Sequence, residues 1–134
     1  MKKKYFTLNE AEELLPEITI KLNRLIRLSK AINILNKIEI NYEDEFEFIT
    51  NEINSRKNSH KLYYQFYMLL EEILNYGVIV KDLNFGLVDF YSKYNDQEIF
   101  LCWQLGENKI KYWHEAESGY DERKPIELLK ELNF

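Results

Sequence analysis

The sequence of 134 residues contains few of the residues that interrupt or crosslink a chain: four glycines, two prolines and one cysteine. A single cysteine excludes an internal disulfide framework and favours a reducing compartment. No run approaches the ~18 apolar residues of a membrane helix. The N-terminal lysines are followed by a charged amphipathic segment, whereas a signal peptide continues into an apolar run. We therefore expect a cytoplasmic protein that has no membrane partner.

Basic residues are also in the minority, with 18 Lys and Arg against 23 Asp and Glu, for a net charge of -5. Phosphate contacts need a basic face, so we expect no nucleic-acid partner. No motif of known catalytic or cofactor-binding mechanism is present. We predict no cofactor, and the sequence does not decide whether the protein is an enzyme. The length and the 46% hydrophobic content are typical of one domain, residues 1–134.

What the sequence does contain is helical periodicity over its first half. Thr7 and Glu10 form the pattern of a capping box, in which each side chain binds the other residue's backbone amide. Pro16 lacks an amide hydrogen, so we expect it to kink the helix or to begin a new one. The prediction is a short first helix followed by a long one.

Two apolar seams with heptad spacing follow the cap, separated by a polar link over residues 41–44. The first seam comprises Leu15, Ile18, Leu22, Leu25, Ser29, Ile32 and Asn36, and the second comprises Phe46, Ile49, Ile53, Arg56, His60, Tyr63, Tyr67, Leu70 and Leu74. Two such seams predict an antiparallel helical hairpin over residues 7–76. Six consecutive polar residues, 54–59, leave open whether the second helix continues or breaks.

After Gly77 the hydrophobic period changes from 3.6 to 2, which predicts a β-meander over residues 77–120. The expected strands are 78–82, 86–91, 97–104 and 109–115, joined by short hairpin links. A C-terminal tail, 121–134, is expected to contain a short helix. The predicted fold class is thus α+β, a long antiparallel helical hairpin followed by a four-stranded antiparallel β-meander packed on one end of it.

The simplest loops give a trial register with Val80 opposite Asp89, Phe90 opposite Ile99 and Cys102 opposite Trp113. The face expected to pack on the helices carries Ile79, Val88, Phe90, Ile99, Leu101, Trp103, Ile110, Tyr112 and His114. The other face carries Val80, Asp82, Leu87, Asp89, Phe100, Cys102, Trp113 and Glu115. This register puts Cys102 and His114 on opposite faces, which disfavours a nucleophilic Cys/His pair.

The meander also resembles a small prokaryotic family, the domain of unknown function 2203. The matching segments are Gly77-Val78-x-Val80-Lys81-Asp82-Leu83-x-x-Gly86-Leu87-Val88-Asp89-Phe90, Leu101-Cys102-Trp103-x-Leu105-Gly106-Glu107, Trp113-His114 and Gly119-Tyr120-x-x-Arg123-x-Pro125-Ile126. The opening Phe6-Thr7-Leu8-x-x-Ala11 and Leu14-Leu15-Pro16 match as well. Two turn positions depart from the family pattern, with Tyr91 where Pro is usual and Glu122 where Gly is usual. The resemblance implies almost nothing about function.

The resemblance does mark a set of positions, and six of them are our candidates for binding. They are Asp82, Asp89, Cys102, Trp113, His114 and Arg123, and Trp103 is marked with them. An alternative hypothesis is a small metal-assisted hydrolase that uses Asp82, Asp89, His114 and Glu115. Structural explanations compete with these roles, because Asp82 can cap its own turn, a mid-strand cysteine is usually a small buried hydrophobe, and surface carboxylates often form ion pairs.

The predicted helices are longer than the predicted sheet. Helices of about 25 to 30 residues span roughly 40 Å, whereas strands of about six residues span about 20 Å. The apolar remainder of the hairpin needs a partner, so we expect a homo-oligomer, a dimer or tetramer through the helices. The main functional hypothesis is a self-associating interaction or ligand-binding module, whose second sheet face is open to a protein or small-molecule partner.

Overall fold

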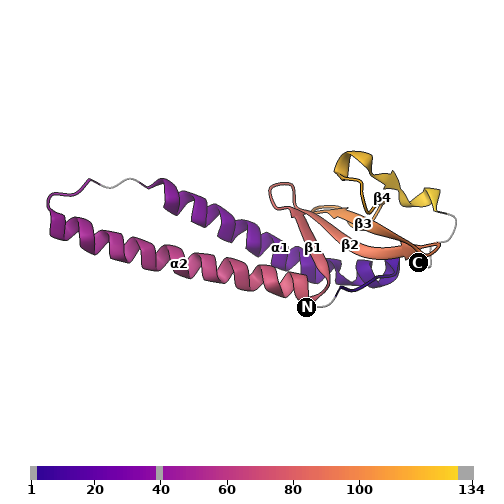
Figure 1. Ribbon diagram of the computed structural model, residues 1–134, viewed down its shortest axis with the longest axis horizontal. Coiled ribbons are helices and arrows are strands. Elements are labelled where there is room, and N and C mark those ends of the chain that lie inside the picture. The colour runs from indigo at the N-terminus through magenta and orange to yellow at the C-terminus, as the bar shows by residue number, and fades with distance from the viewer. Residues whose placement is uncertain (1–2, 39–40, 130–134) are drawn as a thin grey trace.

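The computed structural model describes residues 3–38 and 41–129 and shows a helical hairpin with an antiparallel sheet against one end of it (Figure 1). The hairpin consists of α1 (Leu8–Lys37) and α2 (Glu45–Asn75). The two helices run antiparallel, and Lys21 pairs with Glu72 while Asn36 donates to the hydroxyl of Tyr63. This confirms the predicted architecture. Among the described residues, neither helix combines the length and apolarity needed to cross a membrane.

The start of α1 follows the capping box predicted from the sequence. The Glu10 amide donates to Thr7 Oγ1 at 3.1 Å, and the Thr7 amide donates to Glu10 Oε1 at 3.3 Å. The expectation that Pro16 separates two helices is wrong, because α1 continues through it. Pro16 is exposed, so water can take the place of the amide that proline lacks.

The second helix is continuous across residues 54–59, which settles the point that the sequence left open. Asp44 caps it by accepting a 2.7 Å hydrogen bond from the Glu47 amide. Residues 54–58 are exposed, so their polar side chains remain hydrated and the helix does not need to break to solvate them.

The sheet has five antiparallel strands in chain order, one more than predicted. They are β1 (Val78–Asp82), β2 (Leu87–Tyr94), β3 (Gln97–Gln104), β4 (Tyr112–Glu115) and β5 (Lys124–Pro125). Single 3-10 turns lie at Tyr120–Glu122, between β4 and β5, and at Ile126–Leu128, after β5. The predicted tail helix is therefore a 3-10 turn within the described residues, and positions 130–134 lie outside them.

The turn between β2 and β3 is two residues long. Asn95 and Asp96 have φ values of 51° and 62°, the left-handed conformation of a type I′ hairpin. Phe90 consequently pairs with Leu101, whereas the trial register paired it with Ile99. A slip of two residues keeps every side chain of β3 on its predicted face.

The pairing of β3 with β4 differs from the trial register by one residue, and this difference changes the sheet faces. Cys102 lies opposite Tyr112, and Phe100 lies opposite His114. A one-residue slip turns the whole strand over, so the prediction that His114 and Tyr112 face the helices is wrong. The two residues share the outer face with Cys102.

The pairing of β1 with β2 also differs from the trial register. Val80 pairs with Val88, not with Asp89, so the predicted faces of Ile79 and Val80 are exchanged. An irregularity between Val80 and Asp82 restores the predicted face for Asp82.

The core lies between the helix hairpin and the inner sheet face. Its members include Leu15, Ile18, Leu22, Leu25, Leu69, Ile73, Val88, Phe90, Leu101 and Trp103. The segment before α1 is fixed to β2, because the Phe6 amide donates to the Tyr91 carbonyl at 2.7 Å and Ser92 Oγ donates to the Phe6 carbonyl at 2.6 Å. The sheet end is therefore the well-packed end of the molecule.

The left-handed turn generates a prediction about stability. Replacing Asn95 with Val should lower the free energy of unfolding by about 1–2 kcal/mol, because a β-branched residue is poorly tolerated at positive φ. Asp96→Gly should raise the free energy of unfolding, since Gly is favoured at the second central position of a type I′ turn. Urea unfolding followed by tryptophan fluorescence measures both changes.

The matched control is Asn84→Val, which makes the same substitution in a turn that has no positive φ at that position. Equal destabilisation by Asn95→Val and Asn84→Val would contradict the assigned turn.

Candidate functional site

Three buried polar side chains from three neighbouring strands meet on the outer sheet face. Asp89 on β2 lies directly opposite Cys102 on β3, and His114 on β4 pairs with Phe100, two residues before Cys102. Each of the three residues is only 2% exposed. One carboxylate oxygen, the sulfur and one imidazole nitrogen all lie within 4.8 Å of one another. Buried polar groups are costly unless they are paired, so this cluster needs a physical explanation.

Within this cluster, His114 is held at both of its ring nitrogens. Nδ1 lies 2.9 Å from the Glu115 carbonyl, and Nε2 lies 3.0 Å from Asp89 Oδ2. A carbonyl oxygen only accepts hydrogen bonds, so Nδ1 carries a proton. Burial acts to lower the pKa of His114, but the hydrogen bond and charge of Asp89 outweigh it, so the pKa is raised. The hydrogen bond and charge of Asp89 thus favour the protonated form of His114.

The third member, Cys102, is a protonated thiol in this arrangement. Burial, together with the charge of Asp89, raises the pKa of Cys102 to about 12, against the opposing effect of the Arg123 guanidinium. A thiol with such a pKa is a poor nucleophile near neutral pH. Moreover, His114 directs Nε2 at the carboxylate of Asp89. The structure brings Cys102 and His114 to one face, contrary to the trial register, but their protonation states do not activate the thiol.

A cavity of about 280 Å³ opens beside the cluster. Its lining consists of Lys81, Asp82, Leu87, Asp89, Cys102, His114, Ser118 and Gly119. The cluster is thus buried from bulk solvent and yet adjoins a space large enough for water or a small ligand.

The remaining acidic candidates do not join the cluster. Asp82 lines the cavity, but its Oδ1 accepts a hydrogen bond from the Phe85 amide at 3.1 Å. This bond is the turn cap that offered a structural explanation for Asp82 in the sequence. Glu115 lies on the other sheet face, because it pairs with Ile99, and its carboxylate binds Lys124 at 2.9 Å. The four residues of the hydrolase hypothesis therefore do not converge on one point.

Trp113 also faces away from the cavity. Its indole nitrogen donates to the Pro125 carbonyl at 3.2 Å, which ties β4 to β5. Of the six binding candidates, Trp113 has this structural role, while Asp82, Asp89, Cys102 and His114 line the cavity.

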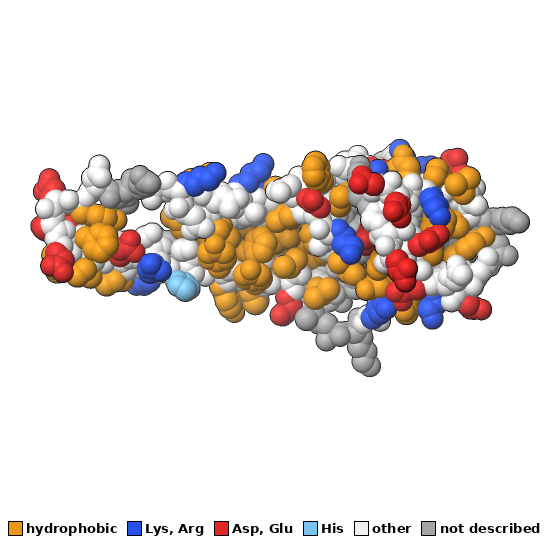
Figure 2. Space-filling view, turned by 45° about the horizontal axis from the view of Figure 1, so that its top comes forward, with side chains coloured by type: hydrophobic (Ala, Val, Ile, Leu, Met, Phe, Trp, Pro, Cys, Tyr) orange, Lys and Arg blue, Asp and Glu red, His pale blue; other side chains and the backbone are white. Residues whose placement is uncertain are grey.

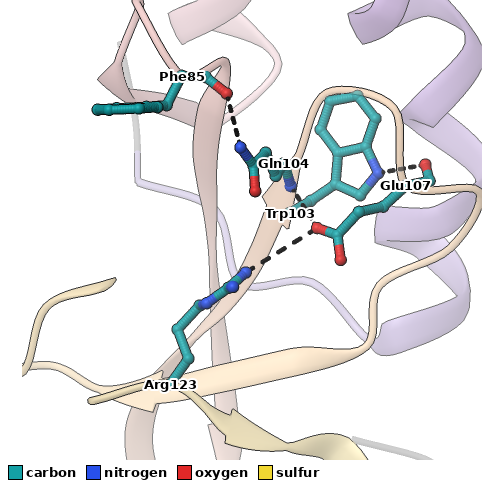
Figure 3. A network of polar contacts seen from close by, with 5 residues as sticks. All are labelled: Phe85, Trp103, Gln104, Glu107 and Arg123. Carbon is teal, nitrogen blue, oxygen red and sulfur yellow. Dashed lines mark hydrogen bonds and ion pairs between the residues drawn. The ribbon is translucent and has the colours of Figure 1, made fainter. Parts of the chain in front are cut away.

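A network of polar contacts fixes the loop between β3 and β4 (Figure 3). Trp103 Nε1 donates to the Glu107 carbonyl at 2.8 Å, and the Gln104 amide donates to Glu107 Oε1 at 2.7 Å. The Gln104 side chain donates to the Phe85 carbonyl at 3.3 Å. Arg123 approaches the same Glu107 oxygen at 4.0 Å. Glu107 was not among the candidate residues, although it stands in the matched segment Leu105-Gly106-Glu107.

Arg123 connects this network to the cluster. Its guanidinium lies 4.3 Å from the ring centroid of Tyr112, a cation–π contact, and it lowers the pKa of Cys102 against the effect of burial. Arg123 therefore positions β4 and supplies positive charge beside the thiol.

The His114–Asp89 pair predicts a pH dependence of stability in the presence of a chelator. A histidine whose pKa is raised in the folded state contributes its full stabilisation at pH values below its unfolded-state pKa, about 6.5. This contribution is lost as the pH rises through its folded-state pKa. The free energy of unfolding should thus fall as the pH rises above about 6.5. Asp89→Asn should flatten this dependence, as measured by urea unfolding across the pH series.

His60→Gln is the control, because His60 is the other histidine and is exposed on α2. The assignment would be wrong if His60→Gln flattened the profile and Asp89→Asn left it unchanged.

The family model described as "Uncharacterized conserved protein (DUF2203)" matches residues 4–126 and so spans both helices and all five strands. No curated protein and no solved structure matches the chain.

Proposed function

We propose that this chain, which belongs to the DUF2203 family of uncharacterised conserved proteins, is a self-associating interaction module. Two copies join through the face of α2 that points away from α1. The outer sheet face, with its cavity, is left for a protein or small-molecule partner. The observation that carries the proposal is a second apolar stripe along α2 that nothing in the described chain covers.

The two stripes of α2 lie on different sides of the helix. The inner stripe, Leu62, Phe66, Leu69 and Ile73, has spacings of four and three and is buried or half-buried. The outer stripe consists of Phe46 (82% exposed), Ile49 (48%), Ile53 (54%), Tyr64 (67%) and Tyr67 (60%). At about 100° per residue, the outer stripe is centred well over a right angle from the inner one. Because α1 packs on the inner stripe, a partner other than α1 is needed to cover the outer stripe.

Packing within one copy buries few side chains of α2. The buried residues of α2 are Leu69 and Ile73, both in its C-terminal part. Figure 2 shows hydrophobic side chains gathered over the middle of the helix pair and an open gap between the helices toward their far end. Because the stability of a protein helix comes mainly from packing of its apolar face, a second copy on the outer stripe would supply what the single chain lacks.

The charges along the outer stripe favour an antiparallel pair of α2 helices. Lys57 and His60 precede the exposed Tyr64 and Tyr67, and Glu71 follows them on the same side of the helix. A two-fold axis between Tyr64 and Tyr67 places Lys57 and His60 of each copy opposite Glu71 of the other. Such a contact is self-complementary and closes as a dimer. Within the described residues, no ion pair engages Lys57 or Glu71.

The proposal predicts the mass of the protein in solution. Light scattering at micromolar concentration should give twice the chain mass of 16.3 kDa. The double variant Tyr64→Glu/Tyr67→Glu should be a monomer, because it introduces like charges at the centre of an apolar contact. The matched control is Phe85→Glu, since Phe85 is as exposed at 65% but lies in the β1–β2 turn, and it should remain a dimer. A monomeric wild-type chain would overturn the proposal.

The antiparallel arrangement makes a separate prediction. Glu71→Lys should weaken the dimer, because it replaces the anion that faces Lys57 of the other copy with a second cation. Adding Lys57→Glu should restore dimerisation, as measured by the concentration dependence of sedimentation. Failure of the charge exchange to restore the dimer would exclude this orientation of the two helices.

A further inference from the structure

We propose that Asp89, Cys102 and His114 bind one Zn²⁺ ion, with its fourth coordination position open to the adjoining cavity. The proposal is independent of self-association, because the three side chains come from one copy. Their candidate ligand atoms lie within 4.8 Å of one another. Two ligands of a tetrahedral zinc ion at 2.0–2.3 Å are about 3.3–3.8 Å apart, so the three groups reach one ion through shifts of about 1 Å.

The orientation of His114 is the one that metal-binding histidines adopt. Such residues donate one ring N–H to a carbonyl or carboxylate and present the other nitrogen to the ion. Here Nδ1 faces the Glu115 carbonyl at 2.9 Å, and Nε2 points at the cluster. The backbone of β4 therefore fixes the tautomer that leaves Nε2 for a metal.

The donor set selects the kind of metal. One sulfur, one imidazole nitrogen and one carboxylate oxygen match the ligands of zinc, whereas calcium and magnesium take oxygen ligands. When the ion binds, the proton on His114 Nε2 and the proton on Cys102 Sγ leave. The thiolate and the Asp89 carboxylate then neutralise the two positive charges of the ion, so the ion and its three ligands together carry no net charge.

The cavity supplies the open position. It adjoins all three ligand residues and is also lined by Lys81 and Asp82. Structural zinc sites have four protein ligands, whereas sites that act on a ligand have three protein ligands and one exchangeable position. Three protein ligands beside a cavity of about 280 Å³ thus indicate a site that can take water or a small anionic ligand on the metal.

The test is metal loading of the full chain. Protein stripped with a chelator is incubated with excess zinc chloride and desalted, and its zinc is measured by mass spectrometry. We expect about one zinc ion per chain, and a loss of at least tenfold in retained zinc for Cys102→Ser, His114→Gln and Asp89→Asn. The control His60→Gln removes the other histidine and should retain the full amount.

Cobalt substitution and thermal unfolding make the test independent of any activity. Cobalt bound at the site should show a sulfur-to-metal charge-transfer absorption that Cys102→Ser abolishes. Excess zinc should raise the melting temperature of the wild-type chain and not that of a folded Asp89→Asn variant. A folded wild-type chain that retains no zinc would overturn the proposal. Equal retention by the three variants would also overturn it, because the ion would then be held elsewhere.

Discussion

The pairing of β3 with β4 is the constraint on which the outer sheet face depends. Because Cys102 lies opposite Tyr112, His114 shares a face with Cys102 and Asp89. A slip of one residue would turn His114 toward the helices and turn Trp113 away from them. Two tryptophans oppose such a slip. Trp103 holds the connecting loop through the Glu107 carbonyl, and Trp113 holds β5 through the Pro125 carbonyl.

The two ends of the molecule are stabilised by different means. At the sheet end, a shared core joins α1, α2 and the inner sheet face, and the Phe6 backbone is bound to β2. Toward the far end of α2 the exposed fractions rise, to 82% at Phe46. The fold of one copy thus explains the site in the sheet but does not explain the length of the helices. The proposed second copy against α2 would give the exposed stripe a physical role.

The elements of the fold could be predicted from the sequence because local patterns determine them. The capping box at Thr7 and the heptad seams locate the helices, and the change of period after Gly77 locates the sheet. Pro16 was misleading because an exposed proline can remain inside a helix when water replaces its hydrogen bond. The polar run 54–59 could not be decided from the sequence, since exposure and helix breakage both explain it.

The site could be predicted only in its residues and not in its geometry. Asp89, Cys102 and His114 stood among the candidates, but the trial register separated Cys102 from His114. The error arose in the β3–β4 loop, where Ile110 was assigned to a strand and instead enters the core ahead of β4. Glu107 holds this loop through backbone and side-chain contacts. Loop length sets strand register, and contacts of this kind have no periodic signal in a sequence.

The most direct test of this account is a nuclear Overhauser measurement between aromatic side chains of β3 and β4. The rings of Phe100 and His114 lie 5.2 Å apart between centroids on the outer face, so their ring protons should give clear cross-peaks. The trial register instead places Glu115 opposite Phe100 and turns His114 to the helices. Absence of the Phe100–His114 cross-peaks, together with contacts from His114 to core residues of the helices, would contradict the register and the cluster built on it.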